Sequence, residues 1–372
     1  MKYQILNGDN RSVLKTIPDN SIDSVITDPP YGIDFLGKSW DADTGSLETY
    51  RECLRVLKPG GHLLAFSAAR TYHHLAITLE QAGFEIRDQI MWIYSSGFPK
   101  SQDVGKNNDM PEWQGWGTSL KPAHEPICLA RKPTKLSIAQ NVQRWGTGAL
   151  NIDAARIPIE GQDTRSGGSN GWDRVEFGEA EPNKYDGNEY VPNAQGRFPS
   201  NVIGEIAEPY QKYFYCPKVS RAERHIGFDC DITQVSMLSE MGGYFIDDAG
   251  NQTDKNVTNI WLPQTGNIYI HGLKEEYRKW CEANGKTPNV GNNHPTVKPV
   301  ELMKYLIKLV TPPNGKVLDP FNGSGSTGMA AVELGHEYIG IEQDANYCEI
   351  SKKRIEAWLK IRDPLRASGL FT

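Results

Sequence analysis

The chain has 372 residues, of which 38% are hydrophobic, and its 40 Lys and Arg residues face 46 Asp and Glu residues. This length buries a sizeable core and corresponds to two domains, or to one large domain with an insertion. The negative net charge excludes a uniformly basic protein that coats nucleic acid, although a local basic cleft is compatible with it. No apolar run approaches the roughly 20 residues of a membrane span, and six irregularly spaced cysteines do not indicate a secreted disulfide framework. We therefore expect a globular, cytoplasmic protein.

Short apolar runs alternate with helical patterns in the N-terminal zone. The stretch 46–61 carries apolar residues at helical spacing and closes with two glycines, which predicts one amphipathic helix ending at Gly60-Gly61. In chain order we expect a strand at 22–26, a helix over 46–61, a strand at 62–68, a helix at 71–83 and a strand at 84–94. This alternation predicts βαβ units and a parallel sheet.

The central zone, residues 133–289, differs in composition. Its segment 161–196 is rich in Gly, Asn and acidic residues and has no period, which indicates loop structure beside a core. Residues 121–157 around its start carry six Lys or Arg residues against two acidic ones. Such a run is either a solvated face or a phosphate-binding surface. We interpret 133–289 as an insertion into the α/β pattern.

The last zone, residues 290–372, returns to α/β character. In chain order we expect a helix at 299–310, a strand at 316–321, a helix at 325–335 closed by Gly335, a strand at 336–342 and a final helix from 346. The insertion therefore splits one α/β pattern, and we expect the two ends of the chain to close one sheet. The predicted domains are 1–132, 133–289 and 290–372.

A glycine-rich turn follows the predicted strand in the C-terminal zone. Gly323, Gly325 and Gly328 let the backbone approach a ligand closely, and the following helix offers free N–H groups. Glu342 follows Gly323 by 19 positions, the spacing of an acid that holds ribose hydroxyls. The turn therefore predicts a site for an adenosine-containing cofactor. A nicotinamide cofactor is one candidate, but Asp319 immediately before the turn would repel a pyrophosphate and attract an ammonium group.

A second candidate site is the tetrapeptide that follows the strand at 22–26. Asp28, Pro29, Pro30 and Tyr31 place a carboxylate and a carbonyl side by side on a rigid backbone, because prolines fix φ and donate no hydrogen bond. Two adjacent acceptors suit one –NH2 group, and the Tyr31 ring offers a surface on which a base stacks. Accepting both amine hydrogens raises the electron density on the nitrogen as it attacks. The alternative is an ordinary Pro-Pro turn.

The two sites together resemble the amino-methylating DNA methyltransferases that use S-adenosylmethionine. The D-P-P-Y clamp comes first and the D-P-F-x-G-S-G turn last, which is similar to the circularly permuted (beta) class of that family. The resemblance implies a Rossmann-like S-adenosylmethionine-dependent methyltransferase fold, circularly permuted, with a large central insertion that serves as the target-recognition region. It covers most of 1–132 and 290–372, and it implies double-stranded DNA as the partner.

The resemblance also implies roles for individual residues. Asp319 lies near the methionine ammonium, Glu342 binds the ribose, and Asp9 in the G-D element lies near the adenine of the cofactor. The segment 294–299, H-P-T-V-K-P, wraps the methionine end. The clamp residues are Asp28, Pro29, Pro30 and Tyr31, and the residues that contact the cofactor are Asp9, Thr296, Lys298, Asp319, Pro320, Phe321, Gly323, Gly325 and Glu342. Residues 124–132 resemble a core strand flanking the target-base pocket.

Basic residues of the insertion and its flanks are candidate DNA contacts. They are Arg131, Lys132, Lys135, Arg144, Lys218, Arg221 and Arg224. Trp113 and Trp116 either contact a DNA strand or belong to a local core. Cys216, His225 and Cys230 lack a C-x-x-C pair, so the sequence predicts no metal site.

The preferred hypothesis is methyl transfer to the N6 of a flipped adenine, since cytosine-N4 members of the family more often begin the clamp with Ser. An N4-cytosine methyltransferase of the same class stays open. A nicotinamide-linked oxidoreductase, which would tolerate Asp28→Ala, and a DNA-binding module without turnover are the alternatives from other classes.

Overall fold

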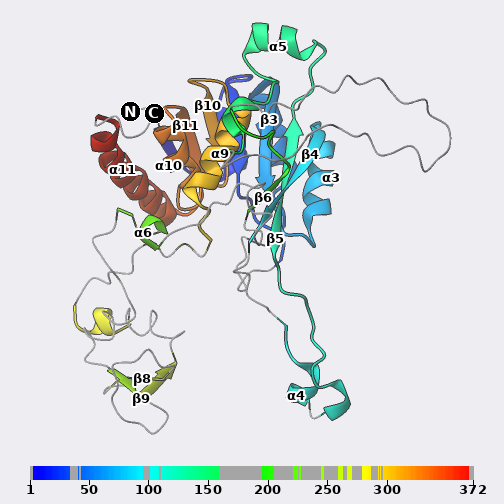
Figure 1. Ribbon diagram of the computed structural model, residues 1–372. Helices are drawn as coiled ribbons and strands as arrows, with labels where there is room; N and C mark the ends of the chain where they lie inside the picture. Colours follow the sequence, from blue (N-terminus) through cyan, green and yellow to red (C-terminus); the bar gives the residue numbers. More distant parts are fainter. Residues whose placement is uncertain are drawn as a thin grey trace, which may run out of the picture. The chain divides into compact units, whose positions relative to one another are not determined.

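The computed structural model (Figure 1) describes residues 3–33, 41, 43–94, 101–108, 110–158, 195–204, 221–224, 226–227, 244–246, 259–262, 266–269, 279–285, 292, 294 and 296–367. Internal contacts divide the chain into two compact units. The first comprises residues 1–218, 298–322 and 326–344, and the second comprises 219–297, 323–325 and 345–372.

The first unit is built on one eight-stranded sheet with the order β1-β11-β10-β2-β3-β5-β4-β6. Its strands are β1 (Tyr3–Asn7), β2 (Ile22–Thr27), β3 (Leu57–Phe66), β4 (Glu85–Ile93), β5 (His124–Arg131), β6 (Val202–Gly204), β10 (Lys316–Asp319) and β11 (Glu337–Glu342). The late strands β10 and β11 pair in parallel with β2 and β1 and lie between them. The prediction that the two ends of the chain close one sheet is therefore confirmed.

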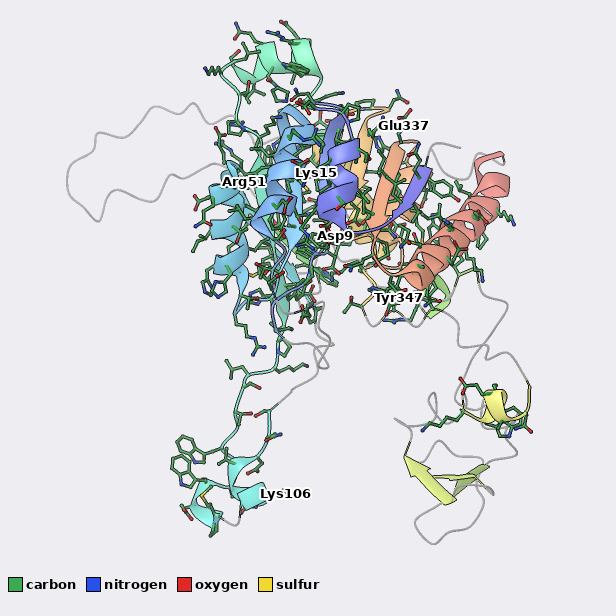
Figure 2. The ribbon with its side chains drawn as sticks, turned by 180° about the vertical axis from the view of Figure 1, so that it is seen from behind. Asp9, Lys15, Arg51, Lys106, Glu337 and Tyr347 are labelled. Carbon is green, nitrogen blue, oxygen red and sulfur yellow. The ribbon has the colours of Figure 1, made fainter. Side chains whose placement is uncertain are left out.

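Helices cover both faces of this sheet. Figure 2 shows the face of α1 (Asn10–Val13), α2 (Leu47–Val56) and α3 (Tyr72–Ala82), and Figure 1 shows the face of α9 (Val300–Val310) and α10 (Ser326–Glu333). The Ser46 hydroxyl caps α2 by accepting a hydrogen bond from the Thr49 amide. Gly83 ends α3 in the left-handed conformation, with φ of 106°.

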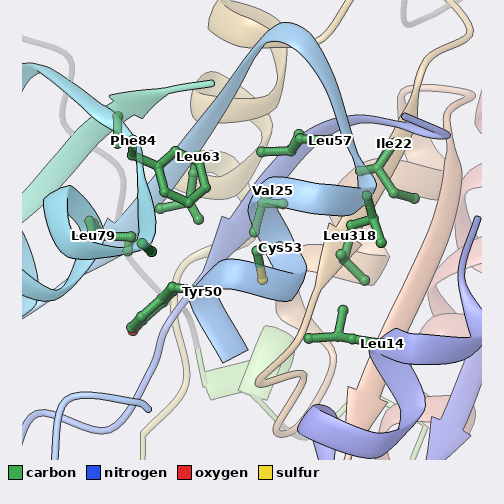
Figure 3. Packing of buried hydrophobic residues seen from close by; sticks show 14 of the residues in the cluster. Leu14, Ile22, Val25, Tyr50, Cys53, Leu57, Leu63, Leu79, Phe84 and Leu318 are labelled. Atoms are coloured by element: carbon green, nitrogen blue, oxygen red, sulfur yellow. The ribbon is translucent and has the colours of Figure 1, made fainter. Parts of the chain in front are cut away.

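The main core lies between the sheet and the α2–α3 layer (Figure 3). Tyr50 and Cys53, one turn apart on α2, are fully buried against Val25 of β2, Leu63 of β3 and Leu318 of β10. Residues from both chain ends therefore share one core. Val25 and Leu318 are paired neighbours close to the carboxyl ends of β2 and β10, so the packed core extends close to the loops that follow these strands.

Two elements differ from the sequence prediction. Helix α2 ends at Val56, and β3 begins at Leu57, although Leu57 continues the apolar spacing of the helix. Pro59 disfavours a helical conformation at Lys58, so the chain leaves the helix before it reaches the two glycines. Strand β5 pairs antiparallel with β3 and β4, so the sheet is mixed rather than wholly parallel.

The beginning of the predicted insertion packs on the first unit. Helix α5 (Ile138–Trp145) starts with a capping box between Ser137 and Gln140. The buried Asn141 side chain donates to the carbonyls of Pro59 and Thr147, at 2.8 and 2.7 Å. A short turn, η5 (Asp153–Ala155), and strand β6 also belong to this unit. Residues 159–194, with most of the Gly- and Asn-rich segment, lie outside the described residues.

In the second unit, α6 (Arg221–Arg224) and α11 (Ala345–Ala367) accompany a three-stranded antiparallel sheet of β7 (Tyr244–Ile246), β8 (Asn259–Leu262) and β9 (Gly266–Tyr269). Within it, the fully buried Arg354 of α11 donates to the Ser324 carbonyl at 2.6 Å and the Glu223 carbonyl at 3.1 Å. Among the described residues of the whole chain, no helix is both long and apolar enough to span a bilayer.

Candidate active site

The carboxyl ends of four neighbouring parallel strands bring four acidic residues to one edge of the sheet. Asp28 follows β2, Asp319 ends β10, Glu342 ends β11, and Asp9 follows β1. Figure 2 shows Asp9 at this edge and Glu337, the first residue of β11, at the other. In parallel α/β sheets, ligands bind outside the carboxyl ends of the strands. The topology therefore places the clamp and much of the predicted cofactor set along one edge.

Two clamp residues, Asp28 and Tyr31, form a compact cluster with the side chains of Glu125 and Lys298. The Tyr31 hydroxyl lies 2.8 Å from Oδ1 of Asp28 and 2.7 Å from Oε2 of Glu125, and its single proton serves one of these bonds at a time. The Lys298 ammonium donates to Oδ2 of Asp28 at 2.6 Å and to the Tyr31 hydroxyl at 3.1 Å, and it lies 3.4 Å from Glu125. Three segments far apart in the sequence thus build one hydrogen-bonded site.

Opposing electrostatic effects act on this cluster. Burial disfavours the charge of Lys298, but the Asp28 and Glu125 carboxylates outweigh it and raise the pKa of the ammonium group. Burial, together with the same two carboxylates, raises the pKa of Tyr31 well above its usual range. Burial and the Glu125 charge likewise raise the pKa of Tyr94 to about 12. The site therefore holds a cation and neutral phenols at neutral pH.

The backbone after the two prolines is fixed by a buried carboxylate. Asp41 accepts hydrogen bonds from the amides of Tyr31, Gly32 and Ile33, at 2.5, 3.2 and 3.3 Å. Three successive N–H groups on one carboxylate define the loop conformation in which the Tyr31 ring points to Asp28. Sequence reasoning did not identify Asp41, because its distance from the clamp along the chain carries no periodic or motif signal.

The carboxylate of Asp319 has a different set of partners. It is 1% exposed and accepts from the hydroxyls of Thr27 and Thr327, at 2.6 and 2.7 Å, and from the Phe321 amide at 3.0 Å. Burial raises the pKa of Asp319 to about 6, although these hydrogen bonds oppose the rise. Among the described residues, no ion pair joins Asp319 to a cationic side chain. The group therefore anchors the start of the glycine turn and favours an added positive charge.

The G-D element joins this arrangement through its backbone. The Gly8 amide donates to the Glu342 carbonyl at 3.0 Å, and Asp9 caps α1 by accepting from the Arg11 amide. Asn10 donates to the Pro320 carbonyl at 3.1 Å. The element is thus tied both to the end of β11 and to the D-P-F turn. Asn10 is a positioning residue to which the sequence analysis assigned no role.

Gly323, Gly325 and Thr296 belong to the second unit. A Cβ added to Gly325 would lie 2.3 Å from the Ser351 hydroxyl, and one added to Gly323 would lie 2.9 Å from the His294 ring. Both glycines have positive φ, 52° for Gly323 and 82° for Gly325. The His294 ring also contacts the Thr296 carbonyl through Nδ1. The turn therefore needs glycine for close packing as well as for its conformation.

S-Adenosylmethionine fits the acidic groups that the first unit presents. The cofactor carries a sulfonium and an ammonium group, and the buried Asp319 carboxylate is held by neutral donors, so a nearby positive charge stabilises its ionised form. Glu342 stands at the end of the next strand, where an acid accepts hydrogen bonds from ribose hydroxyls. Among the described residues, no group of His, Cys, Asp and Glu side chains is arranged to hold a metal ion.

Four of the predicted DNA contacts lie at the other edge of the sheet. Arg131 pairs with Glu85 at 2.6 Å, and the Lys132 ammonium donates to Asn20 and to the carbonyls of Arg55 and Leu57. Lys135 and Arg144 are exposed, but their segment packs on the beginning of β3 through Asn141, at the end opposite the clamp. The structure therefore places these four residues away from the clamp, and their contact with DNA stays a prediction.

The other candidates have mixed outcomes. Arg224 is half-buried and donates to the His294 carbonyl at 3.3 Å, and burial lowers its pKa. Lys218, the side chain of Arg221, Cys216, His225 and Cys230 lie outside what the structure describes. Trp113 and Trp116 are 43% and 60% exposed and meet edge to face at 5.0 Å, so neither belongs to a core. Both lie in the connection between β4 and β5.

Glu125 and Lys298 show what sequence reasoning missed. Glu125 stands in the predicted strand beside the target-base pocket, but no motif marked it as part of the clamp. The resemblance assigned Lys298 to the cofactor, whereas the structure places its ammonium group in the clamp. Only the antiparallel pairing of β5, which turns its first residues toward the carboxyl end of β3, brings Glu125 there.

Comparisons with known proteins agree with this geometry. The DNA methylase family (N6_N4_Mtase) matches residues 22–353. A type II methyltransferase, M2.MboI of Moraxella bovis, is 39% identical over 102 residues, which cover 27% of this chain and 30% of that protein. The DNA adenine methyltransferase YhdJ of Escherichia coli K12 is 23% identical over 95% of this chain and 82% of its own. The crystal structure of an M1.HpyAVI–SAM complex aligns over 95% of this chain and 99% of its own, with a TM-score of 0.44 and 18% identity. The chain belongs to the family of S-adenosylmethionine-dependent DNA methylases that act on exocyclic amines.

Proposed function

We propose that the protein transfers a methyl group from S-adenosylmethionine to the N6 amine of adenine in double-stranded DNA. The observation that carries this proposal is the clamp, where Asp28, Tyr31 and Glu125 already surround a nitrogen cation. A site that accepts hydrogen bonds from –NH3⁺ also accepts them from the –NH2 group of a nucleobase. Family membership excludes the oxidoreductase alternative.

The residues of the chain perform three tasks in this reaction. Asp28 and the Pro29 carbonyl accept the two amine hydrogens and raise the electron density on N6. Tyr31 offers its ring to a base flipped out of the duplex, a step needed because the target nitrogen is otherwise inside the helix. Asp319 and Glu342 hold the cofactor, whose sulfonium supplies an activated methyl group. Methyl transfer to N6 would break the bond between sulfur and the methyl carbon, and it would release neutral S-adenosylhomocysteine and one amine proton, which the Asp28 carboxylate would accept.

Adenine is favoured over cytosine on two grounds. The clamp begins with Asp, as in the adenine-specific members that the sequence resembles. In addition, the E. coli relative that matches most of this chain is named an adenine methyltransferase. Cytosine N4 is the second candidate, since the same acceptors fit its amine. We also keep the expectation that the enzyme works in the cytoplasm.

The first experiment identifies the methylated base. The protein is incubated with S-adenosylmethionine and mixed-sequence duplex DNA, and the digested nucleosides are analysed by mass spectrometry beside the Asp28→Ala protein. N6-methyladenine that is absent with the variant supports the proposal. N4-methylcytosine would retain the mechanism and overturn the choice of base. No methylated base, from protein that binds the cofactor, would favour a DNA-binding module without turnover.

Sequence recognition is proposed to reside in residues 133–289. Deleting 160–196 should weaken sequence selectivity before it weakens cofactor binding, and unchanged selectivity would contradict this assignment. The exposed tryptophans Trp113 and Trp116 are proposed to contact DNA, because their connection leads into β5 and Glu125. Stacking on a base is worth about 1–3 kcal/mol, so Trp116→Ala should lower DNA affinity at least about fivefold in a fluorescence-anisotropy titration.

A further inference from the structure

The most unusual feature of the clamp is that it is filled by a side chain of the protein itself. Lys298 is 8% exposed at its side chain, and its ammonium group contacts both carboxylates and the Tyr31 hydroxyl. The same nitrogen lies over two aromatic rings, 4.9 Å from the centre of Phe66 and 5.4 Å from that of Tyr31. A nitrogen with hydrogens, surrounded by acceptors and ring faces, is also what a flipped adenine brings.

Both oxygens of the Asp28 carboxylate are engaged in this arrangement. Oδ1 accepts from Tyr31 and Oδ2 accepts from Lys298, at 2.8 and 2.6 Å. A target amine that approaches Asp28 therefore meets an acceptor that already has a strong, charge-assisted hydrogen bond. The ammonium and the amine compete for the same place.

We propose that Lys298 is an internal substitute for the target amine: its ammonium group holds the clamp in its reactive geometry without DNA and leaves when a base enters. Without a cation there, Asp28 and Glu125 would face each other across Tyr31 with uncompensated charges, which costs free energy in a buried site. Lys298 removes that cost and keeps the acceptors preorganised. Among the described residues, Tyr94 and Asp319 also interact electrostatically with members of this cluster, and neither supplies a positive charge.

This inference rests on the proposed function in one respect, that the substrate is an exocyclic amine. It predicts a particular pattern of affinities for two duplexes, one with adenine at the target position and one with purine, which lacks the amine. The wild-type protein should bind the adenine duplex only slightly more tightly than the purine duplex, because the adenine amine merely replaces the hydrogen bonds of Lys298. Without the ammonium group, the adenine amine donates to acceptors that have no other donor, so the full free energy of its hydrogen bonds adds to the affinity.

The test measures the affinities for both duplexes at pH 8 with S-adenosylhomocysteine present, using wild type, Lys298→Met and Lys298→Gln. The preference for adenine over purine should rise at least about tenfold in Lys298→Met, and less in Lys298→Gln, since a hydrogen bond to a charged group is worth roughly that ratio or more. An unchanged or smaller preference would overturn the proposal. Lys316→Met, which removes an ammonium that pairs with Glu337 at the other edge, is the control and should retain the wild-type preference.

A second measurement uses only the wild-type protein, in case the variants do not fold. Lysines are acetylated with an N-hydroxysuccinimide ester in the two DNA complexes, and the rate at Lys298 is read by peptide mass spectrometry. Both duplexes cover the same surface, so only occupation of the clamp differs. Several-fold faster acetylation with the adenine duplex supports displacement, and equal rates contradict it. If the enzyme methylates cytosine instead, cytosine and 2-pyrimidinone replace the two bases, so failure of the adenine assignment and failure of this inference are distinguished.

Discussion

Two aspartates at the ends of neighbouring strands, Asp28 after β2 and Asp319 on β10, have opposite surroundings. Asp28 is half-buried and pairs with the Lys298 ammonium, while Asp319 is fully buried and, within the part of the chain that the structure describes, accepts from two hydroxyls and an amide. The first carboxylate is therefore balanced by the protein's own cation. The second is not, and its pKa rises to about 6.

The contrast follows from what each group has to bind. A neutral amine carries no positive charge to balance the negative charge of the Asp28 carboxylate. At the clamp, the protein itself therefore provides a cation, the Lys298 ammonium group. A cofactor with a sulfonium and an ammonium group brings its own positive charge, so the protein leaves Asp319 uncompensated. If the two carboxylates divide base and cofactor between them, substitutions at the two positions should have separable effects.

The largest effect is expected at the clamp. Asp28→Asn keeps the shape but replaces one acceptor with a donor and removes the charge, so the single-turnover methylation rate should fall roughly 10²- to 10³-fold. The affinity for S-adenosylmethionine, measured by calorimetry, should stay within about twofold of wild type. A comparable loss of cofactor affinity would show that Asp28 is not confined to the base site.

Asp319 is expected to act through pH. Its folded-state pKa of about 6 lies above the model-peptide value, so it binds a proton more tightly in the folded protein. Its contribution to stability is thus fully present below about pH 4 and is lost as pH rises through about 6, a change of about 3 kcal/mol. Asp319→Asn should lack this dependence in urea unfolding experiments at pH 4.5 and 7.5.

The same group should couple protons to cofactor binding. A positive ligand favours the ionised carboxylate, so wild-type affinity for S-adenosylmethionine should weaken as pH falls below about 6, with release of a proton on binding. Asp319→Asn should show a weak affinity without this pH dependence. Equal pH dependence in both proteins would assign the effect to another group.

A smaller effect is expected from the second clamp carboxylate. Glu125→Gln keeps an oxygen that accepts from Tyr31, but it removes a charge 3.4 Å from Lys298. We expect the single-turnover rate to fall roughly tenfold, since one of several preorganised electrostatic contacts is lost. Glu85→Gln, at the other edge, is the matched control and should be active at the wild-type rate. A loss as large as that of Asp28→Asn would make the two carboxylates equivalent.

The smallest effect concerns the basic residues that the structure places at the far edge. Lys135→Ala combined with Arg144→Ala should change DNA affinity less than about twofold at a fixed salt concentration, because neither residue is near the clamp. If the double variant instead reduced the slope of log affinity against log salt concentration by the equivalent of nearly two phosphate contacts, these residues would belong to the DNA-binding surface.

Local patterns were sufficient to predict most of the elements of the first unit. The strand before Asp28, the helix that Gly83 ends and the strand–turn–helix around Asp319 all have short-range signals in the form of apolar period, glycine and cap. The end of α2 was missed because the helical apolar spacing continues through Leu57, while the restriction imposed by Pro59 prevails. Here two local preferences of the sequence, for continuing the helix and for leaving it, compete within a few residues.

The clamp was only half predictable for a different reason. Asp28 and Tyr31 form a motif, but Glu125 and Lys298 join them through pairings across 94 and 270 positions, respectively. No local signal states which way β5 runs, and that direction decides which end of the strand carries Glu125 to the site. The resemblance to a family supplied the identity of the motifs, but not the contact between Lys298 and Asp28.

The strand order also governs how this protein reaches its native state. The Lys316 backbone amide donates to the Asp23 carboxylate across 293 positions, and β10 and β11 lie between β1 and β2, two strands that are made much earlier in synthesis. Until β10 and β11 emerge from the ribosome, β1 lacks its neighbour β11, and β2, although paired with β3, exposes one unpaired edge. Such long-range pairing slows folding and makes early chains prone to aggregation. Methylating activity should therefore appear only after β10 and β11 are released, and chaperone dependence should be greatest just before that moment.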